Sequence, residues 1–294
     1  MLLWFSILSS VAAPTPVDVS IRDSIEASLG RVIGADAPAI GNQVARLLRW
    51  KGDVIKNVHP GDKLKLLFER APEPELVALV YSGSEIDLRA YRFDDADGIS
   101  RYYDESGTLI EPWLLHSPVD GYVQITETVQ TGRGKRRHHG LDLKAPEGTP
   151  VLTPFDGVVA RVNWGSGRAN GKCLEVTYEN GTVGRFLHLS TVEPVAVPGA
   201  KLEAGTRIGA VGSTGHSLAP HLHYEIRAPA GDALDPLEEH GTERAVVAAE
   251  KRQAFDVARR AFEVALTGVS ATTAVAVPGP ADLMGPVQTL QTIQ

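Results

Sequence analysis

Short segments of alternating apolar and polar residues, broken by glycine-containing turns, dominate the middle of this sequence and constrain its fold most strongly. In residues 61–116 these segments are rich in Val, Leu, Ile and Tyr. The pairs that separate them are typical of turns: Pro60-Gly61, Ser82-Gly83, Asp97-Gly98 and Ser106-Gly107. This pattern predicts antiparallel hairpins. It continues through residues 117–230 without a helical period, which favours an antiparallel β-sandwich-like domain there.

Helical periodicity flanks this β region on both sides. Residues 13–60 contain two short segments with apolar residues on one side, the first ending at Gly30, and residues 231–268 contain a run rich in Ala, Arg, Glu and Lys. Residues 269–294 are low in charge and interrupted by Pro and Gly, so we expect a flexible tail. The chain is therefore predicted to be mainly β, with a small α+β N-terminal region before the sandwich-like domain and a C-terminal helix after it.

The first residues predict export. Residues 1–12 are apolar or small and end in Ser10-Val11-Ala12, which suits cleavage of a signal peptide. No Lys or Arg precedes the apolar run, so a buried N-terminal helix stays an alternative. We expect a location in the periplasm or the cell envelope. No segment approaches the ~20 apolar residues of a membrane span, so no stable span is expected.

Charge and cysteine content exclude some classes of protein. The formal net charge is −7 and the pI about 5.7, which argues against nucleic acid as the main partner because phosphate binding favours a basic surface. The single cysteine, Cys173, excludes an internal disulfide framework.

Two histidine clusters suggest a metal site. In "PHLHYE", His221 and His223 would point to the same face of a strand, with the intervening leucine in the core. In "HHGLD", His138 and Asp142 would also share a strand face, and Gly140 between them would leave a gap for a metal ion. A catalytic zinc site needs three protein ligands and an open position. One histidine of the H-x-H pair could bind the metal while the other handles protons.

The motifs "HHGLD", "FLHLS" and "PHLHYE" resemble, in order and spacing, those of the lysostaphin-type zinc endopeptidases, which cleave peptide crosslinks in bacterial cell walls. The spacer "APEGTPVLTPFDGVVARV" and the stretch "GTRIGAVGSTG" are also typical of that family. The resemblance covers residues 117–228. Before it, "LLRWKGDVIKNVHPGDKLKLLFE" and "RAYRFDDADGISRYYDESGTLIEPWLLHSPV" resemble the N-terminal part of the periplasmic murein endopeptidases of Gram-negative bacteria. This chain has "GYVQITETVQTGRGKRRHHG" where those enzymes usually carry an arginine-and-His-Pro stretch before the first motif.

The resemblance implies a role for each motif residue. It implies that His138, Asp142 and His223 bind one Zn²⁺, and that His188 and His221 lie beside the metal-bound water. Zinc lowers the pKa of its water from 15.7 to near 7 and polarises the scissile carbonyl. His188 and His221 would stabilise the intermediate and move protons, and the sequence does not distinguish which of them is the general base. The implied substrates are peptidoglycan stem peptides, with a D,D-crosslink as the first choice of bond.

Three further residues are candidates for supporting roles. Glu225 could share a strand face with His223 and orient it, or it could face solvent. Arg133 and Arg136 belong to a basic run that could attract carboxylates of the substrate, or they could lie on a solvated loop.

Two other classes of function compete with this interpretation. A non-catalytic relative could bind the wall and regulate another hydrolase, but such proteins lose ligands and this chain keeps all five motif residues. The stretch "VPGAKLEAGTRIGAVGST" resembles the glycine-bounded strands of lipoyl- and biotin-type carrier domains. A carrier needs a lysine at the tip of a hairpin to hold its cofactor, and Lys201 is not in such a position. A regulatory protein partner stays possible under any of these interpretations.

Overall fold

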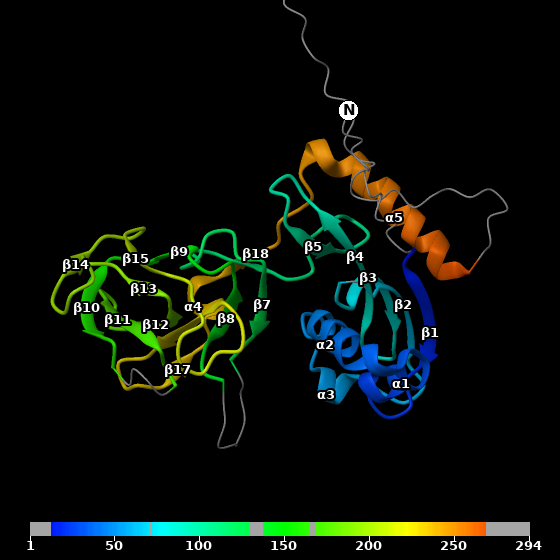
Figure 1. The fold of residues 1–294 in the computed structure, drawn as a ribbon, viewed down its shortest axis with the longest axis horizontal. Helices are drawn as coiled ribbons and strands as arrows, with labels where there is room; N and C mark the ends of the chain where they lie inside the picture. Colours follow the sequence, from blue (N-terminus) through cyan, green and yellow to red (C-terminus); the bar gives the residue numbers. More distant parts are fainter. Residues whose placement is uncertain (1–12, 71, 130–137, 165–168, 269–294) are drawn as a thin grey trace, which may run out of the picture. The chain divides into compact units, whose positions relative to one another are not determined.

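The structure, a computed structural model, describes residues 13–70, 72–129, 138–164 and 169–268, and it forms two compact units (Figure 1). Unit 1 combines Met1–Ile110 with Val246–Gln294, and unit 2 is the continuous stretch Glu111–Ala245. The predicted fold class is confirmed: the chain is mainly antiparallel β, with a small α+β N-terminal region and a C-terminal helix. The predicted signal peptide and tail lie outside the described residues.

Unit 1 is a five-stranded antiparallel sheet in chain order, β1 to β5. Leu88 and Ala90 of β4 share a hydrophobic core with the helices α1 and α2. Phe93 points to the other face, where its ring packs 5.4 Å from that of Phe255 on α5. The elements are β1 (Thr15–Ser20), α1 (Ile25–Ile33), η1 (Gly34–Asp36), α2 (Ala37–Leu48), α3 (Val54–Asn57), β2 (Lys63–Glu69), β3 (Glu75–Ser82), β4 (Asp87–Asp94), β5 (Ser100–Tyr103), η2 (Ala249–Lys251) and α5 (Arg252–Thr267).

The helices differ in extent from those predicted. The first was expected to end at Gly30, but α1 continues to Ile33, and Gly34 ends it with a φ of +59°. A glycine inside a helix costs only about 1 kcal/mol relative to alanine, so packing overrides it. The C-terminal helix was expected over residues 231–268, but α5 begins at Arg252, because two short strands and two short helical segments occupy the residues before it.

The described residues of unit 2 form three antiparallel sheets. The largest has the order β14-β10-β11-β12-β16-β8-β7, with β17 beside β16; the others are β13-β15-β9 and β18-β6. The elements are β6 (Trp113–Leu114), β7 (Gln124–Glu127), β8 (Leu141–Lys144), β9 (Pro150–Leu152), β10 (Gly157–Val162), β11 (Lys172–Tyr178), β12 (Val183–Leu189), β13 (Thr191–Val192), β14 (Lys201–Leu202), β15 (Arg207–Ala210), β16 (His221–Arg227), β17 (Ala233–Leu234), α4 (Pro236–His240) and β18 (Thr242–Glu243).

Strand β16 carries the H-x-H pair and lies inside the large sheet, between β12 and β8. Its alternate residues Leu222 and Tyr224 are fully buried. Because side chains alternate along a strand, His221 and His223 point to the opposite face, as the sequence predicted. Burial of the intervening residues therefore fixes the register that presents both imidazoles on one surface.

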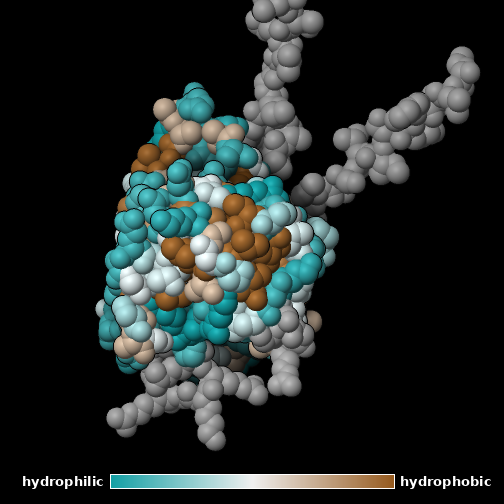
Figure 2. Space-filling model, turned by 90° about the vertical axis from the view of Figure 1, so that its left-hand side faces the viewer, coloured by the Kyte–Doolittle hydropathy of each residue, from teal (hydrophilic) through white to brown (hydrophobic). Residues whose placement is uncertain are grey.

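Exposed apolar residues gather on the surface at the β10–β14 end of unit 2, where Figure 2 shows a hydrophobic patch. The exposed valines of this region are Val158 on β10, and Val195 and Val197 in the segment before β14. None of these residues belongs to β8, β12 or β16, so the patch is not part of the strands that carry Asp142, His188 and the H-x-H pair.

Candidate metal centre

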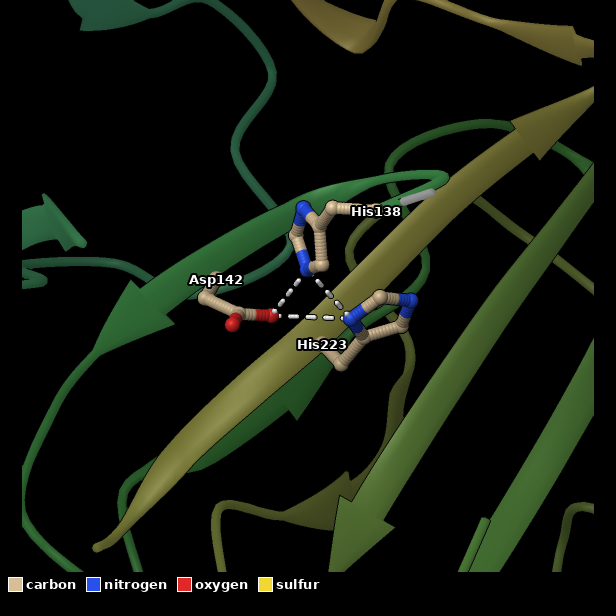
Figure 3. A group of neighbouring side chains, drawn as sticks. All are labelled: His138, Asp142 and His223. Carbon is tan, nitrogen blue, oxygen red and sulfur yellow. Dashed lines mark hydrogen bonds and ion pairs between the residues drawn. The ribbon is translucent and has the colours of Figure 1, made fainter. Parts of the chain in front are cut away.

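Three side chains from two separate motifs converge in unit 2 (Figure 3). His138 Nε2 lies 3.0 Å from Asp142 Oδ1 and 3.0 Å from His223 Nδ1. His223 Nδ1 lies 2.8 Å from the same Asp142 oxygen. In the part of the chain that the structure describes, this group is the one whose donor atoms are spaced to hold a metal ion.

Strand pairing and one loop contact build this arrangement. His223 and Asp142 are directly paired across β16 and β8, so their side chains meet on one face. His138 does not share a strand with Asp142 as predicted, because β8 begins at Leu141. Its ring is instead oriented by Nδ1, which donates to the carbonyl of Thr128 over 3.1 Å. That contact turns Nε2 towards Asp142.

The donor set fits zinc. Two imidazole nitrogens and one carboxylate oxygen are ligand types that catalytic zinc takes, with a fourth position open. Bond lengths of ~2.0–2.1 Å in a tetrahedron separate the ligand atoms by about 3.3 Å. The separations of 2.8–3.0 Å within the cluster therefore need to open by only a few tenths of an ångström to admit the ion.

The electrostatics of the cluster favour positive charge at the same point. Burial opposes ionisation of Asp142, but hydrogen bonds with His138 and His223 outweigh it and hold the pKa of this carboxyl well below its usual range. Burial also opposes protonation of His223, but hydrogen bonds with Asp142 and Glu225 raise the pKa of His223 to about 9. An environment that stabilises a proton between these groups also suits a cation.

Two more histidines flank the three donors. The ring of His188 lies 4.9 Å from that of His221 and 5.9 Å from that of His223, between centroids. Nδ1–H of His188 donates to the Thr214 carbonyl over 2.9 Å, and Nδ1–H of His221 donates to the Ala219 carbonyl over 2.8 Å. A carbonyl can only accept, so in each neutral ring Nε2 carries the lone pair. Both rings can therefore accept a proton through Nε2.

The surroundings of His188 and His221 differ. His188 is buried, and burial lowers the pKa of His188 to about 4, so its ring is neutral at neutral pH. Its backbone has a φ of +63°, an uncommon conformation outside glycine that is often found at functional sites. His221 Nε2 lies 3.6 Å from Asp142 Oδ1, at the edge of the donor cluster.

Comparison with known proteins agrees with this geometry. Residues 136–236 match the profile of peptidase family M23, and this segment contains the three converging donors and both flanking histidines. This segment belongs to peptidase family M23. The resemblance to lysostaphin-type enzymes, inferred from three short motifs, is thus confirmed.

Individual M23 relatives are similar over a larger part of the chain. The peptidoglycan DD-endopeptidases ShyA and ShyC of Vibrio cholerae are 30% and 28% identical, and the matches cover 63% and 66% of this chain. The DD-carboxypeptidase/endopeptidase Mpg of Neisseria meningitidis is 36% identical over 40% of this chain and 28% of its own length. The chain spans about half the length of the curated relatives it matches, 44% of ShyA and 46% of ShyC.

Gly140 has a different role in this M23 segment from the one predicted. The sequence suggested that its missing side chain leaves a gap for the metal. A Cβ placed at Gly140 would instead lie 2.1 Å from the carbonyl oxygen of Tyr224 and 3.0 Å from Cγ of Glu225. The glycine therefore allows the chain between His138 and Asp142 to approach the backbone of β16.

We expect Gly140→Ala to destabilise the fold and weaken metal binding. The new methyl must displace β16 or the loop that carries His138, and overpacking of this kind costs typically ~1–3 kcal/mol, occasionally more. Urea unfolding and zinc titration would measure the two effects. Gly30→Ala is the matched control, because its Cβ would meet its nearest neighbour at an ordinary 3.9 Å. Unchanged stability in Gly140→Ala would contradict the close approach of this loop to β16.

The supporting residues predicted from the sequence have different outcomes. Glu225 does share the face of His223, and its Oε1 lies 3.0 Å from His223 Nε2. It is buried, so the alternative of a solvent-facing residue is excluded. Arg133 and Arg136 lie outside the described residues. His216, to which the motifs assign no role, lies exposed in the loop before the H-x-H pair.

No sequence signal pointed to the groups that orient the flanking histidines and His138. The carbonyls of Thr128, Thr214 and Ala219 act through the backbone, so residue type carries no information about them. Arg185 and Arg227, which contact Glu225, did have a signal. Their charges stand at strand positions that alternate with buried apolar residues.

Proposed function

We propose that this protein is a zinc-dependent endopeptidase that hydrolyses peptide crosslinks of bacterial peptidoglycan. The observation that carries the proposal is the convergence of His138, Asp142 and His223, with His188 and His221 beside them, inside an M23 segment. Two V. cholerae relatives are named peptidoglycan DD-endopeptidases, which supports the D,D-crosslink between stem peptides as the bond.

One zinc ion per chain would be held by His138 through Nε2, by Asp142 through Oδ1 and by His223 through Nδ1. These are the atoms that face one another in the cluster. When bound, zinc supplies a Lewis acid for the scissile carbonyl and a source of nucleophile at neutral pH. Three protein ligands would leave the fourth coordination position open for that chemistry.

His188 and His221 would then move protons and stabilise charge. Each has Nδ1–H committed to a backbone carbonyl and therefore presents Nε2. One ring accepts the proton of the attacking water, and proton transfer to the leaving amine completes the reaction. The glutamate that acts as base in H-E-x-x-H enzymes has no counterpart in this sequence.

The non-catalytic alternative is not favoured. A wall-binding regulator has no need to keep metal ligands or proton-moving groups in position. Here both flanking histidines have their rings oriented by backbone carbonyls, and His223 is held by Glu225. This degree of orientation is expected of a catalytic site.

A substrate in the cell wall implies export, so we propose that the protein acts in the periplasm or the cell envelope. The small residues at positions 10–12 support signal-peptide cleavage. Among the described residues, no helix combines the length and apolar character needed to cross a bilayer.

Digestion of purified sacculi tests the proposal. We expect the zinc-loaded protein to convert crosslinked muropeptide dimers into monomers that end in D-alanine, because a D,D-endopeptidase cuts the bond between the stem peptides. Mass spectrometry of the released muropeptides identifies the bond. Release of free sugars, or cleavage between sugar and peptide, would contradict the proposal.

A further inference from the structure

Four neighbouring strands of the large sheet carry one charged residue each at directly paired positions. Arg161 of β10 is paired with Glu175 of β11, Glu175 with Arg185 of β12, and Arg185 with Glu225 of β16. The charges alternate in sign across the sheet. We call this set, together with Arg227 of β16, the charged row.

The carboxylates of the charged row are held by arginines. Glu225 Oε2 lies 2.6 Å from Nη2 of Arg227 and 3.4 Å from Nη1 of Arg185. Nε of Arg185 lies 2.6 Å from Oε1 of Glu175, and Glu175 also pairs with Arg161, whose Nη2 is 2.7 Å from Oε1. The side chains of Glu175 and Glu225 are only 7% and 8% exposed, and a buried carboxylate needs partners of opposite charge close to it.

The charged row ends at Glu225, which contacts His223 of the candidate metal centre. The two oxygens of Glu225 have separate tasks: Oε2 receives the arginines, whereas Oε1 lies 3.0 Å from His223 Nε2. An ionised carboxylate can only accept, so Nε2 must carry the hydrogen. Nδ1 of the same ring is then the nitrogen left for the metal, and it is the atom that faces Asp142 and His138.

We propose that Arg227 and Arg185 are positioning residues for the metal centre. Acting through the Glu225 carboxylate, they fix the ring of His223 with Nε2–H inward and Nδ1 towards the metal. Arg227 contacts Glu225 with two nitrogens, Nε at 2.7 Å and Nη2 at 2.6 Å. Arg185 connects the same carboxylate to Glu175 and prevents it from turning away. This inference rests on the proposed metal site and names the residues that orient it.

Zinc affinity provides the first readout. Groups that orient a metal-bound histidine typically contribute ~10–100-fold to metal affinity. We therefore expect Arg227→Gln and Arg185→Gln to weaken zinc binding by about that factor, measured by competition with a chromophoric chelator. Arg227→Lys keeps the charge but not the two-nitrogen contact, so its affinity should be intermediate. Thermal unfolding of each variant separates loss of fold from loss of orientation.

Arg161→Gln is the matched control. Arg161 belongs to the same row, but among the described residues its ion pair is with Glu175 and not with Glu225, and its side chain is 46% exposed. Loss of Arg161 leaves Glu175 paired with Arg185 and leaves the contacts of Glu225 in place, so zinc affinity should stay within about twofold of the wild type. An equal loss in Arg161→Gln would show that the row supports the sheet in general, and would overturn the assignment of Arg227 and Arg185.

Hydrogen exchange at His223 provides a readout that does not require zinc. In ¹⁵N-histidine-labelled protein, the Nε2–H of His223 should exchange slowly in the wild type and at least ~10-fold faster in Arg227→Gln and Arg185→Gln, since the acceptor is no longer fixed. Unchanged exchange and unchanged zinc affinity in both variants would overturn the inference. A wild type that binds no zinc, but shows this exchange pattern, would instead refute the proposed function and leave the positioning role supported.

Discussion

His138→Ala and His223→Ala should each lose zinc and activity together. Each change removes one of three converging donors, and two remaining ligands do not hold the ion in a defined geometry. Lewis-acid catalysis is worth several kcal/mol, and each ~1.4 kcal/mol is a factor of ten in rate. We therefore expect crosslink hydrolysis to fall by about 1,000-fold or more, with zinc content measured by elemental analysis of the same preparations.

His139→Ala is the control for this pair of variants. His139 is adjacent to His138 in sequence but is exposed and is not one of the three donors. It should keep its zinc and most of its activity. Full zinc retention in His223→Ala would show that the H-x-H pair has been assigned incorrectly.

His188→Ala and His221→Ala should keep their zinc and lose rate. Both rings lie beside the donors rather than among them, and a third imidazole, as a fourth protein ligand, would occupy the position needed for water. General acid–base catalysis typically contributes ~100- to 10,000-fold. The two variants should therefore lose about that much turnover at near-stoichiometric zinc. His216→Ala, in the exposed loop nearby, should be close to the wild type.

Loss of zinc from His221→Ala, with zinc retained in His223→Ala, would show that His221 is the ligand and His223 the proton-moving residue. The structure favours His223 as the ligand, because His221 Nε2 is 3.6 Å from Asp142 Oδ1 whereas His223 Nδ1 is 2.8 Å away. Comparison of the remaining activity of His188→Ala and His221→Ala would show which ring contributes more as the general base.

The strands and the two sides of β16 could be predicted because their signals are local. Alternation around Leu222 is enough to place His221 and His223 on one face, and burial of that leucine enforces it. Local sequence patterns alone do not predict that His138, Asp142 and His223 meet. Their meeting was anticipated because three motifs together resembled a known family.

What could not be predicted depends on tertiary contacts. Gly140 looks the same in sequence whether it leaves a gap or allows close approach, and only the position of the Tyr224 carbonyl distinguishes these roles. Helix α5 packs on β2 and β4, which lie far from it in sequence. The link from Arg185 to His223 also needed the register of β12 against β16, which no short segment determines.

The muropeptide profile of sacculi, measured as zinc is added back to the chelator-stripped protein, tests the zinc-dependent endopeptidase function most directly. We predict that conversion of crosslinked dimers to monomers is absent without zinc, rises in proportion to bound zinc and stops rising at one ion per chain. Conversion that is complete in the stripped protein, or dimers that persist when one zinc is bound, would contradict this function.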